Sequence, residues 1–230
     1  MRSTNRDRPD HRGTALRAVI AVLLIGIVLI VPVSANTATY YIAENGTSFL
    51  AEVTLINQSG YLLFSTGFIG EGAELKVNNL MLTAENGTVV NTTKKSFTQI
   101  AFPEGNYTLV YDAPLDGHLM YAQYLVPFNT TVFLPSGFHT NNVLLGPVSN
   151  GGVTYNVKED RVLLRNLGIT ADAAKYETAV VWTYKREIQM QFYPVSYEKD
   201  FVLCMGLWFV LLCIVGYRYW RLKRKADQYL

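Results

Sequence analysis

Only a few side chains in this sequence have types and spacing that could do chemistry. Asp112, Asp116 and His118 stand close together, and carboxylates with an imidazole are groups that can bind a cation. The same residues surround Gly117 in a turn-forming stretch, where solvated charged side chains are common. We expect solvated turn residues here and predict no metal site.

Serine chemistry is the second hypothesis, because Ser149 and His139 could form a nucleophile and its base. Ser136 and Ser149 both lie in turn sequences, and so does the carboxylate pair Glu159 and Asp160. The sequence contains no H-E-x-x-H, G-x-S-x-G, P-loop or G-x-G-x-x-G motif. We therefore predict that the protein is not an enzyme and has no catalytic residue, cofactor or cofactor-binding residue.

The stretch most typical of a binding site is the Gly- and Asn-rich segment 136–152. It carries Phe138, His139, Leu144 and Leu145, and apolar side chains in a loop often mark a contact surface. We name these four residues as the candidate contact loop. The alternative is that they fold back over the core.

The elements that must position this loop are predicted to be strands. Turn signals recur every 8–12 residues or so, and Tyr (15) and Phe (11) are abundant, which favours an all-β domain. The pattern predicts an Ig-like antiparallel β-sandwich in one or two subdomains, over 36–112 and 118–196, with a linker at 113–117. Strict alternation predicts a half-buried strand over 180–192.

Finer features follow from the same signals. Turns are expected at 57–60 and at 103–105, where Asn, Gly and Pro gather. A short strand is expected over 161–166, and a helical turn over 170–177 with Thr170 or Asp172 as its cap.

The C-terminal part reads as a membrane anchor. Residues 201–220 are almost entirely apolar, and a basic tail follows at 221–230. A helix of this length just crosses a hydrocarbon core, and short basic flanks stay cytoplasmic. We therefore predict a single-pass protein of the cell membrane whose domain lies outside and whose C-terminus is cytoplasmic.

The N-terminal part, 1–35, is predicted to be a signal peptide cut between Ala35 and Asn36. Five arginines precede a short apolar run, and small residues precede the cut. The alternative is an uncleaved signal anchor. Either form places the middle of the chain outside the cell.

Six Asn-X-Ser/Thr sequons lie in this external part, and we predict that the protein is a glycoprotein. They begin at Asn45, Asn57, Asn86, Asn91, Asn106 and Asn129.

Charge and cysteine content exclude other classes of function. Between residues 36 and 200 there are ten basic and fifteen acidic side chains, so the domain is mildly acidic and no nucleic-acid partner is expected. Cys204 and Cys213 are the only cysteines, and both lie in the predicted anchor. We read them as small apolar residues of a membrane helix.

Several segments resemble an archaeal family of membrane-anchored proteins that is known only as a domain of unknown function. They are EGNYTLVYDAPL (104–115), VPFNTTVFLPSG (126–137) and LLGPVSNGG (144–152), followed by a Trp-bearing strand that runs into the anchor. The resemblance implies a β-rich ectodomain on the archaeal cell surface with one C-terminal transmembrane helix. It implies no activity and no catalytic residue.

These observations predict a non-enzymatic surface protein with a structural or binding role. Its partners would be the lipid bilayer and surface-layer or membrane proteins. The alternative is an accessory subunit of a larger membrane complex. An extracellular hydrolase is a third reading, ranked last because no motif supports it.

Overall fold

The computed structural model describes residues 35–66, 72–170, 172 and 174–226. The predicted signal peptide or anchor of residues 1–35 therefore lies outside the described residues, apart from Ala35. Most of a Gly-rich segment between β3 and β4 lies outside them as well.

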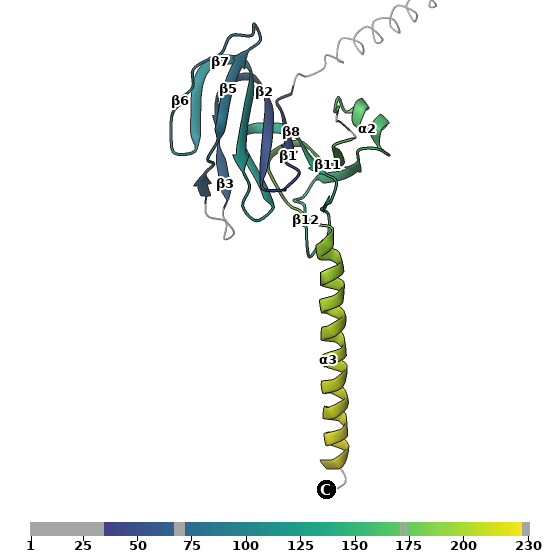
Figure 1. The fold of residues 1–230 in the computed structure, drawn as a ribbon. Helices are drawn as coiled ribbons and strands as arrows, with labels where there is room; N and C mark the ends of the chain where they lie inside the picture. The colour runs from purple at the N-terminus through teal and green to yellow at the C-terminus, as the bar shows by residue number, and fades with distance from the viewer. Residues whose placement is uncertain (1–34, 67–71, 171, 173, 227–230) are drawn as a thin grey trace, which may run out of the picture. The chain divides into compact units, whose positions relative to one another are not determined.

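Most of the described chain before residue 196 forms one mixed sheet of eight strands (Figure 1). The prediction of a β-rich domain is confirmed. The strand order, with β6 (Thr93–Lys94) pairing beside β7, is β10 (Gly152–Asn156), β11 (Tyr176–Gln191), β8 (Leu119–Pro135), β1 (Thr37–Ile42), β2 (Ser48–Leu62), β7 (Gln99–Pro114) and β5 (Asn78–Ala84).

Two small sheets accompany the main one. β3 (Phe64–Thr66) pairs with β4 (Gly72–Glu74), and β9 (Phe138–His139) pairs with β12 (Tyr193–Pro194). The described residues do not show an Ig-like sandwich, so that finer arrangement stays a prediction.

The short strand β1 joins the two long strand pairs of the sheet. It runs antiparallel to β2 and parallel to β8, so that Tyr40 lies beside both Ala51 and Val132. The parallel pair differs from the predicted all-antiparallel arrangement. A parallel pair needs a long connection between its strands, and the chain from β2 to β7 provides one between β1 and β8. Strands from 36–112 and from 118–196 thus share one sheet, while their division into domains stays a prediction.

Two predicted turns are wrong because the chain bends there without leaving the sheet. Residues 57–60 lie inside β2 and residues 103–105 lie inside β7. The register shifts between Leu55 and Gln58, and Asn57 takes a left-handed φ of 52°. The Asn57 N–H donates to Asn106 Oδ1 at 2.9 Å. The turn-forming residues therefore make a β-bulge, which kinks a long strand.

A second bulge bends the β8–β11 pair in the same way. The predicted strand 180–192 is confirmed as β11, but its register shifts between Trp182 and Lys185. Tyr184 has a φ of 55°, which is uncommon for a bulky residue. Its N–H donates to Asn129 Oδ1 at 3.0 Å. Each bulge is thus fixed by an asparagine of the neighbouring strand.

The predicted strand over 161–166 is wrong, because Arg161–Asn166 forms the helix α2. Short apolar runs fit either structure, and here Leu164 is the helix residue that is buried.

Residues 171 and 173 of the helical turn predicted over 170–177 lie outside the described residues. The Tyr176 N–H donates to Asp172 O at 3.0 Å, which closes a single helical turn, and the Ala174 N–H donates to Asp172 Oδ1 at 3.0 Å, as the predicted cap would accept. The turn is short, because β11 begins at Tyr176.

Both faces of the central strands carry buried side chains. One face carries the main core, where Tyr40, Val132 and Trp182 are buried together. The opposite face carries a smaller cluster, in which Phe133 and Val181 pack with Leu164 of α2. Alternate residues of β1, β8 and β11 therefore serve two different cores.

A chain of buried hydroxyl groups runs through the main core. Tyr40 Oη lies 3.1 Å from both Tyr61 Oη and Tyr124 Oη, and Thr130 Oγ1 donates to Tyr124 Oη at 3.0 Å. Tyr61 Oη lies 3.4 Å from Tyr111 Oη. Burial raises the pKa of all four phenols, that of Tyr111 to about 12, so each keeps a proton to donate.

The C-terminal helix α3 spans Ser196–Ala226. Its 31 residues correspond to roughly 46 Å at about 1.5 Å per residue. It is the one helix among the described residues that is long and apolar enough to cross a membrane, and its apolar stretch is not buried against the rest of the described chain. This agrees with the predicted single span. Cys204 and Cys213 are exposed on it as free thiols.

Replacing Tyr40 with phenylalanine should destabilise the domain. The change leaves the Tyr61 and Tyr124 hydroxyls buried with one partner fewer, which costs roughly 1–3 kcal/mol of unfolding free energy. Denaturant unfolding of the full chain in detergent measures this cost. Tyr184→Phe is the control, because it removes the same group from an exposed side chain. A Tyr40→Phe protein as stable as the wild type would contradict the role given to these hydroxyls.

Candidate functional site

The structure places the candidate contact loop beside the start of α3. β9 pairs with β12 so that His139 lies opposite Tyr193, and β12 ends two residues before α3 begins. The Val195 N–H also donates to Gly137 O at 3.0 Å. The loop is thus tied to the residues that lead directly into the helix.

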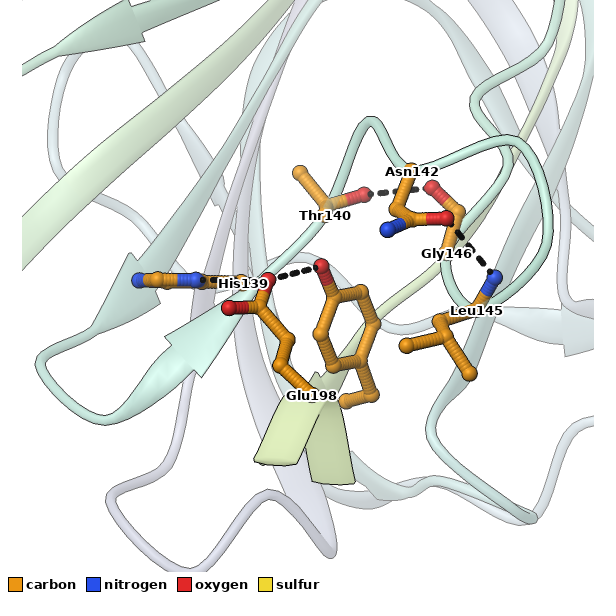
Figure 2. Close-up of polar contacts among 7 residues, drawn as sticks. His139, Thr140, Asn142, Leu145, Gly146 and Glu198 are labelled. Atoms are coloured by element: carbon orange, nitrogen blue, oxygen red, sulfur yellow. Dashed lines mark hydrogen bonds and ion pairs between the residues drawn. The ribbon is translucent and has the colours of Figure 1, made fainter. Parts of the chain in front are cut away.

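Glu198 is the centre of a polar clamp at this junction (Figure 2). Its Oε1 accepts a hydrogen bond from Tyr193 Oη at 2.7 Å and lies 3.2 Å from His139 Nδ1. The Tyr193 hydrogen bond, and then the His139 contact, lower the pKa of the Glu198 carboxyl. Burial, together with the Glu198 carboxylate, raises the pKa of Tyr193 to about 12. The first turn of α3 is therefore fastened to β9 and β12.

The loop after β9 is braced by its own hydrogen bonds (Figure 2). The single Thr140 hydroxyl proton is shared between Gln191 O, at 2.8 Å from Oγ1, and Gly146 O, at 3.3 Å. Asn142 Oδ1 accepts from the Leu144 and Leu145 N–H groups at 3.0 and 3.3 Å. These bonds fix the loop as a short, ordered turn.

Gly146 lets this loop lie flat on the aromatic ring of Tyr193. A Cβ at residue 146 would stand 2.8 Å from Tyr193 Cδ1 and 2.9 Å from Gln191 O, which is closer than real Cβ atoms approach. Any larger residue would push the loop away from the strand. The glycine is therefore required by the close approach.

The four predicted contact residues differ in exposure. Phe138 is 8% exposed and packs against Phe192, so the alternative that it covers the core is correct for this residue. His139 and Leu145 are half-buried. Leu144 is 70% exposed.

Sequence reasoning missed three residues of this site. Val143, next to Leu144, is 89% exposed, so the tip of the loop presents two adjacent apolar side chains. Tyr193 and Glu198 form the clamp. The Asn141-Asn142 pair, typical of a turn, could have marked the tip. An acidic residue in the first turn of a helix could have drawn attention to Glu198.

Several of the other residues considered for chemistry have structural partners. Ser149 Oγ accepts from Trp182 Nε1 at 3.1 Å and from the Gln189 N–H at 3.0 Å, while His139 pairs with Glu198. Asp112 Oδ1 accepts from Asn79 Nδ2 at 2.7 Å. Within the described part of the chain, no three His, Cys, Asp or Glu residues gather as metal ligands would.

His118 and the carboxylate pair of Glu159 and Asp160 were also considered for chemistry. The His118 ring packs against Phe138 and Phe192, with ring centroids 5.5 and 5.3 Å away. Asp160 Oδ2 accepts from the Asn156 N–H at 2.9 Å, in the turn before α2, and Glu159 is exposed.

The sequon asparagines lie mainly on the surface. Asn129 is the half-buried one among the six. Asn106 and Asn129 also fix the two bulges. The exposed ones are Asn45, Asn57, Asn86, Asn91 and Asn106.

Residues 34–228 match the sequence model of a family described as a family of unknown function (DUF5803). The chain belongs to the DUF5803 family. The match spans the main sheet and all of α3, so both are parts of the DUF5803 region. The expected membership of a family of unknown function is confirmed, while the archaeal source stays a prediction.

No curated protein matches the chain. Among solved structures, it is similar to the crystal structure of an aminopeptidase N family protein from Idiomarina loihiensis, with a TM-score of 0.35 and 11% sequence identity. The likeness covers 68% of this chain and 29% of that one, so the chain spans less than a third of that protein. A likeness of this size says nothing about activity.

Acid should loosen the clamp at Glu198. A carboxyl with a lowered pKa stabilises the fold above its ordinary pKa and loses that effect as pH falls through the lowered pKa. In the wild type, we expect the hydrogen-exchange protection of the Val195 amide to fall as pH is lowered. In Glu198→Gln, we expect that protection to be low and not to change as pH passes through the pKa of the Glu198 carboxyl.

The control for this experiment is Glu159→Gln, which removes an exposed carboxylate far from the junction in the chain. It should keep the wild-type pH profile. A Glu198→Gln protein with that same profile would contradict the clamp.

Proposed function

We propose that this DUF5803 protein is a non-enzymatic binding module, held at the outer surface of a cell membrane by α3. The observation that carries the proposal is the apolar tip formed by Val143 and Leu144. Isolated apolar side chains are ordinary on a surface, but this pair is adjacent, largely exposed and part of a loop held by hydrogen bonds.

Rigidity is what makes this tip suited to binding. A contact surface that is already ordered loses little conformational entropy when it meets a partner. The hydrogen bonds of Thr140 and Asn142 and the packing of Gly146 on Tyr193 supply that order. Residues that dominate an interface are commonly apolar anchors of this kind.

The outer location is supported by the basic residues that follow the apolar part of α3. Short basic segments remain on the cytoplasmic side, so the sheet would lie outside. Exposed sequons agree with that side, since glycans are attached to surface asparagines of secreted domains. An archaeal surface follows from the family resemblance, and an Ig-like sandwich remains the finer proposal for the fold.

A second candidate is an accessory subunit of a larger membrane complex. It is favoured by the clamp, because the loop is tied to the first turn of α3 and a partner at the tip would meet the protein near the membrane. An extracellular hydrolase ranks last. Hydrolysis of peptides or glycosides by the purified protein, lost on replacing His139 or His118, would reverse this order.

A photo-cross-linking residue at position 144 should yield a discrete protein adduct in native membranes. The same probe at position 163 is the control, because Leu163 is also exposed but belongs to α2. Adding Val143→Asp should reduce the adduct about tenfold, which corresponds to losing roughly 1.4 kcal/mol of binding free energy.

The identity of the cross-linked protein also distinguishes the candidate functions. One stoichiometric membrane protein would identify an accessory subunit, and surface-layer protein would identify a surface module. Adducts with lipid alone, or no more adduct than at position 163, would contradict a protein-binding role for the tip.

A further inference from the structure

The sheet face opposite the tyrosine core holds a second feature, a pocket of about 340 Å³. Side chains of four adjacent strands form its floor, and the segment that follows α2 forms one wall. Its lining residues used below are Tyr41, Glu52, Asn129, Thr131, Phe133 and Thr39.

The floor of the pocket is ordered in cross-strand rows, because paired residues of a sheet point to the same face. One row is polar and runs from Glu52 through Thr39 to Thr131. The next row is aromatic, with Tyr41 beside Phe133 and the two rings stacked at 5.4 Å between centroids. Phe133 is 0% exposed, so the pocket offers hydroxyl and carboxylate groups next to the half-exposed ring of Tyr41.

This combination suits a saccharide. Sugar hydroxyls exchange hydrogen bonds with threonine hydroxyls and a carboxylate, while the apolar face of a sugar ring packs on an aromatic side chain. The volume lies within the roughly 300–1,000 Å³ typical of small-molecule sites.

Asn129 connects this pocket to the sequons. It lines the pocket, and it is half-buried where the other five sequon asparagines are exposed. Its Oδ1 accepts the hydrogen bond from the Tyr184 N–H. A glycan attached to Nδ2 leaves the amide oxygen in place, so the bulge and the modification are compatible.

We propose that Asn129 is glycosylated and that the first sugar of its glycan lies in this pocket, against the Tyr41–Phe133 stack and the Glu52–Thr39–Thr131 row. The glycan is the pocket's own ligand. It covers the part of this sheet face that is open to solvent, where Glu52 is exposed and Thr39 and Tyr41 are half-exposed. The proposal rests on the outer location given under Proposed function.

The test uses two matched variants that abolish a sequon and keep its asparagine. Thr131→Val removes the acceptor signal at Asn129, and Thr108→Val removes it at Asn106, which makes the equivalent bond to Asn57 but is exposed. Both replacements conserve volume and leave the bulges fixed. Full-length protein from its native host is analysed by glycopeptide mass spectrometry and by hydrogen exchange.

We expect Asn129 to be occupied in the wild type. Loss of its glycan in Thr131→Val should speed exchange of β1 and of residues 167–170 by about tenfold, whereas Thr108→Val should leave them unchanged. Wild type and Thr131→Val made without glycosylation should exchange alike, which shows that the methyl group itself has no effect. If they differ, glycosylated and unglycosylated wild type are compared directly.

Failure of this proposal and failure of the proposed outer location give different results. Occupied sequons elsewhere with a bare Asn129, or an occupied Asn129 without added protection of the pocket, would overturn this proposal and leave the surface module intact. Six unoccupied sequons would overturn the proposal together with the support that glycosylation gives to an outer location.

Discussion

The pairing of β1 on both its edges is the constraint on which this fold depends. The strand has six residues, yet it is the element that joins the β2–β7 pair to the β8–β11 pair. Successive side chains of β1 point to opposite faces of the sheet. Tyr40 lies at the centre of the buried hydroxyl chain on one face, and Tyr41 lies in the pocket on the other. A change in β1 register by one residue would exchange these faces and dismantle both.

The two bulges give the sheet its second constraint. Four strands of 15 to 17 residues are too long to remain straight around one core, and each long pair bends where an asparagine accepts the N–H of a left-handed residue. Because the bend is fixed by a side chain of the neighbouring strand, it is a defined joint. The joint between Asn129 and Tyr184 lies at the pocket, and β11 continues beyond it toward β12 and the clamp at Glu198.

Sequence patterns predicted the β-rich domain, the apolar C-terminal helix and the strand at 180–192, because each has a strong local period or composition. The same patterns placed turns at 57–60 and 103–105, because Asn, Gly and Pro mark a bulge as readily as a turn. The prediction for residues 161–166 was a strand, because a short apolar run does not distinguish a strand from a helix. The candidate loop was located, but Glu198 and Tyr193 join it only through pairing of β9 with β12, which no local signal reports.

The burial of Thr131 has a consequence for timing. A glycosyl transferase must reach both Asn129 and the hydroxyl two residues later, and Thr131 is 6% exposed once β8 lies between β1 and β11. On the proposal that Asn129 is glycosylated, sugar transfer at this sequon would have to precede closure of the sheet, and the two processes would compete on the nascent chain. The fraction of molecules glycosylated at Asn129 would then depend on how long the sheet stays open, so this fraction would report the rate of folding in the cell.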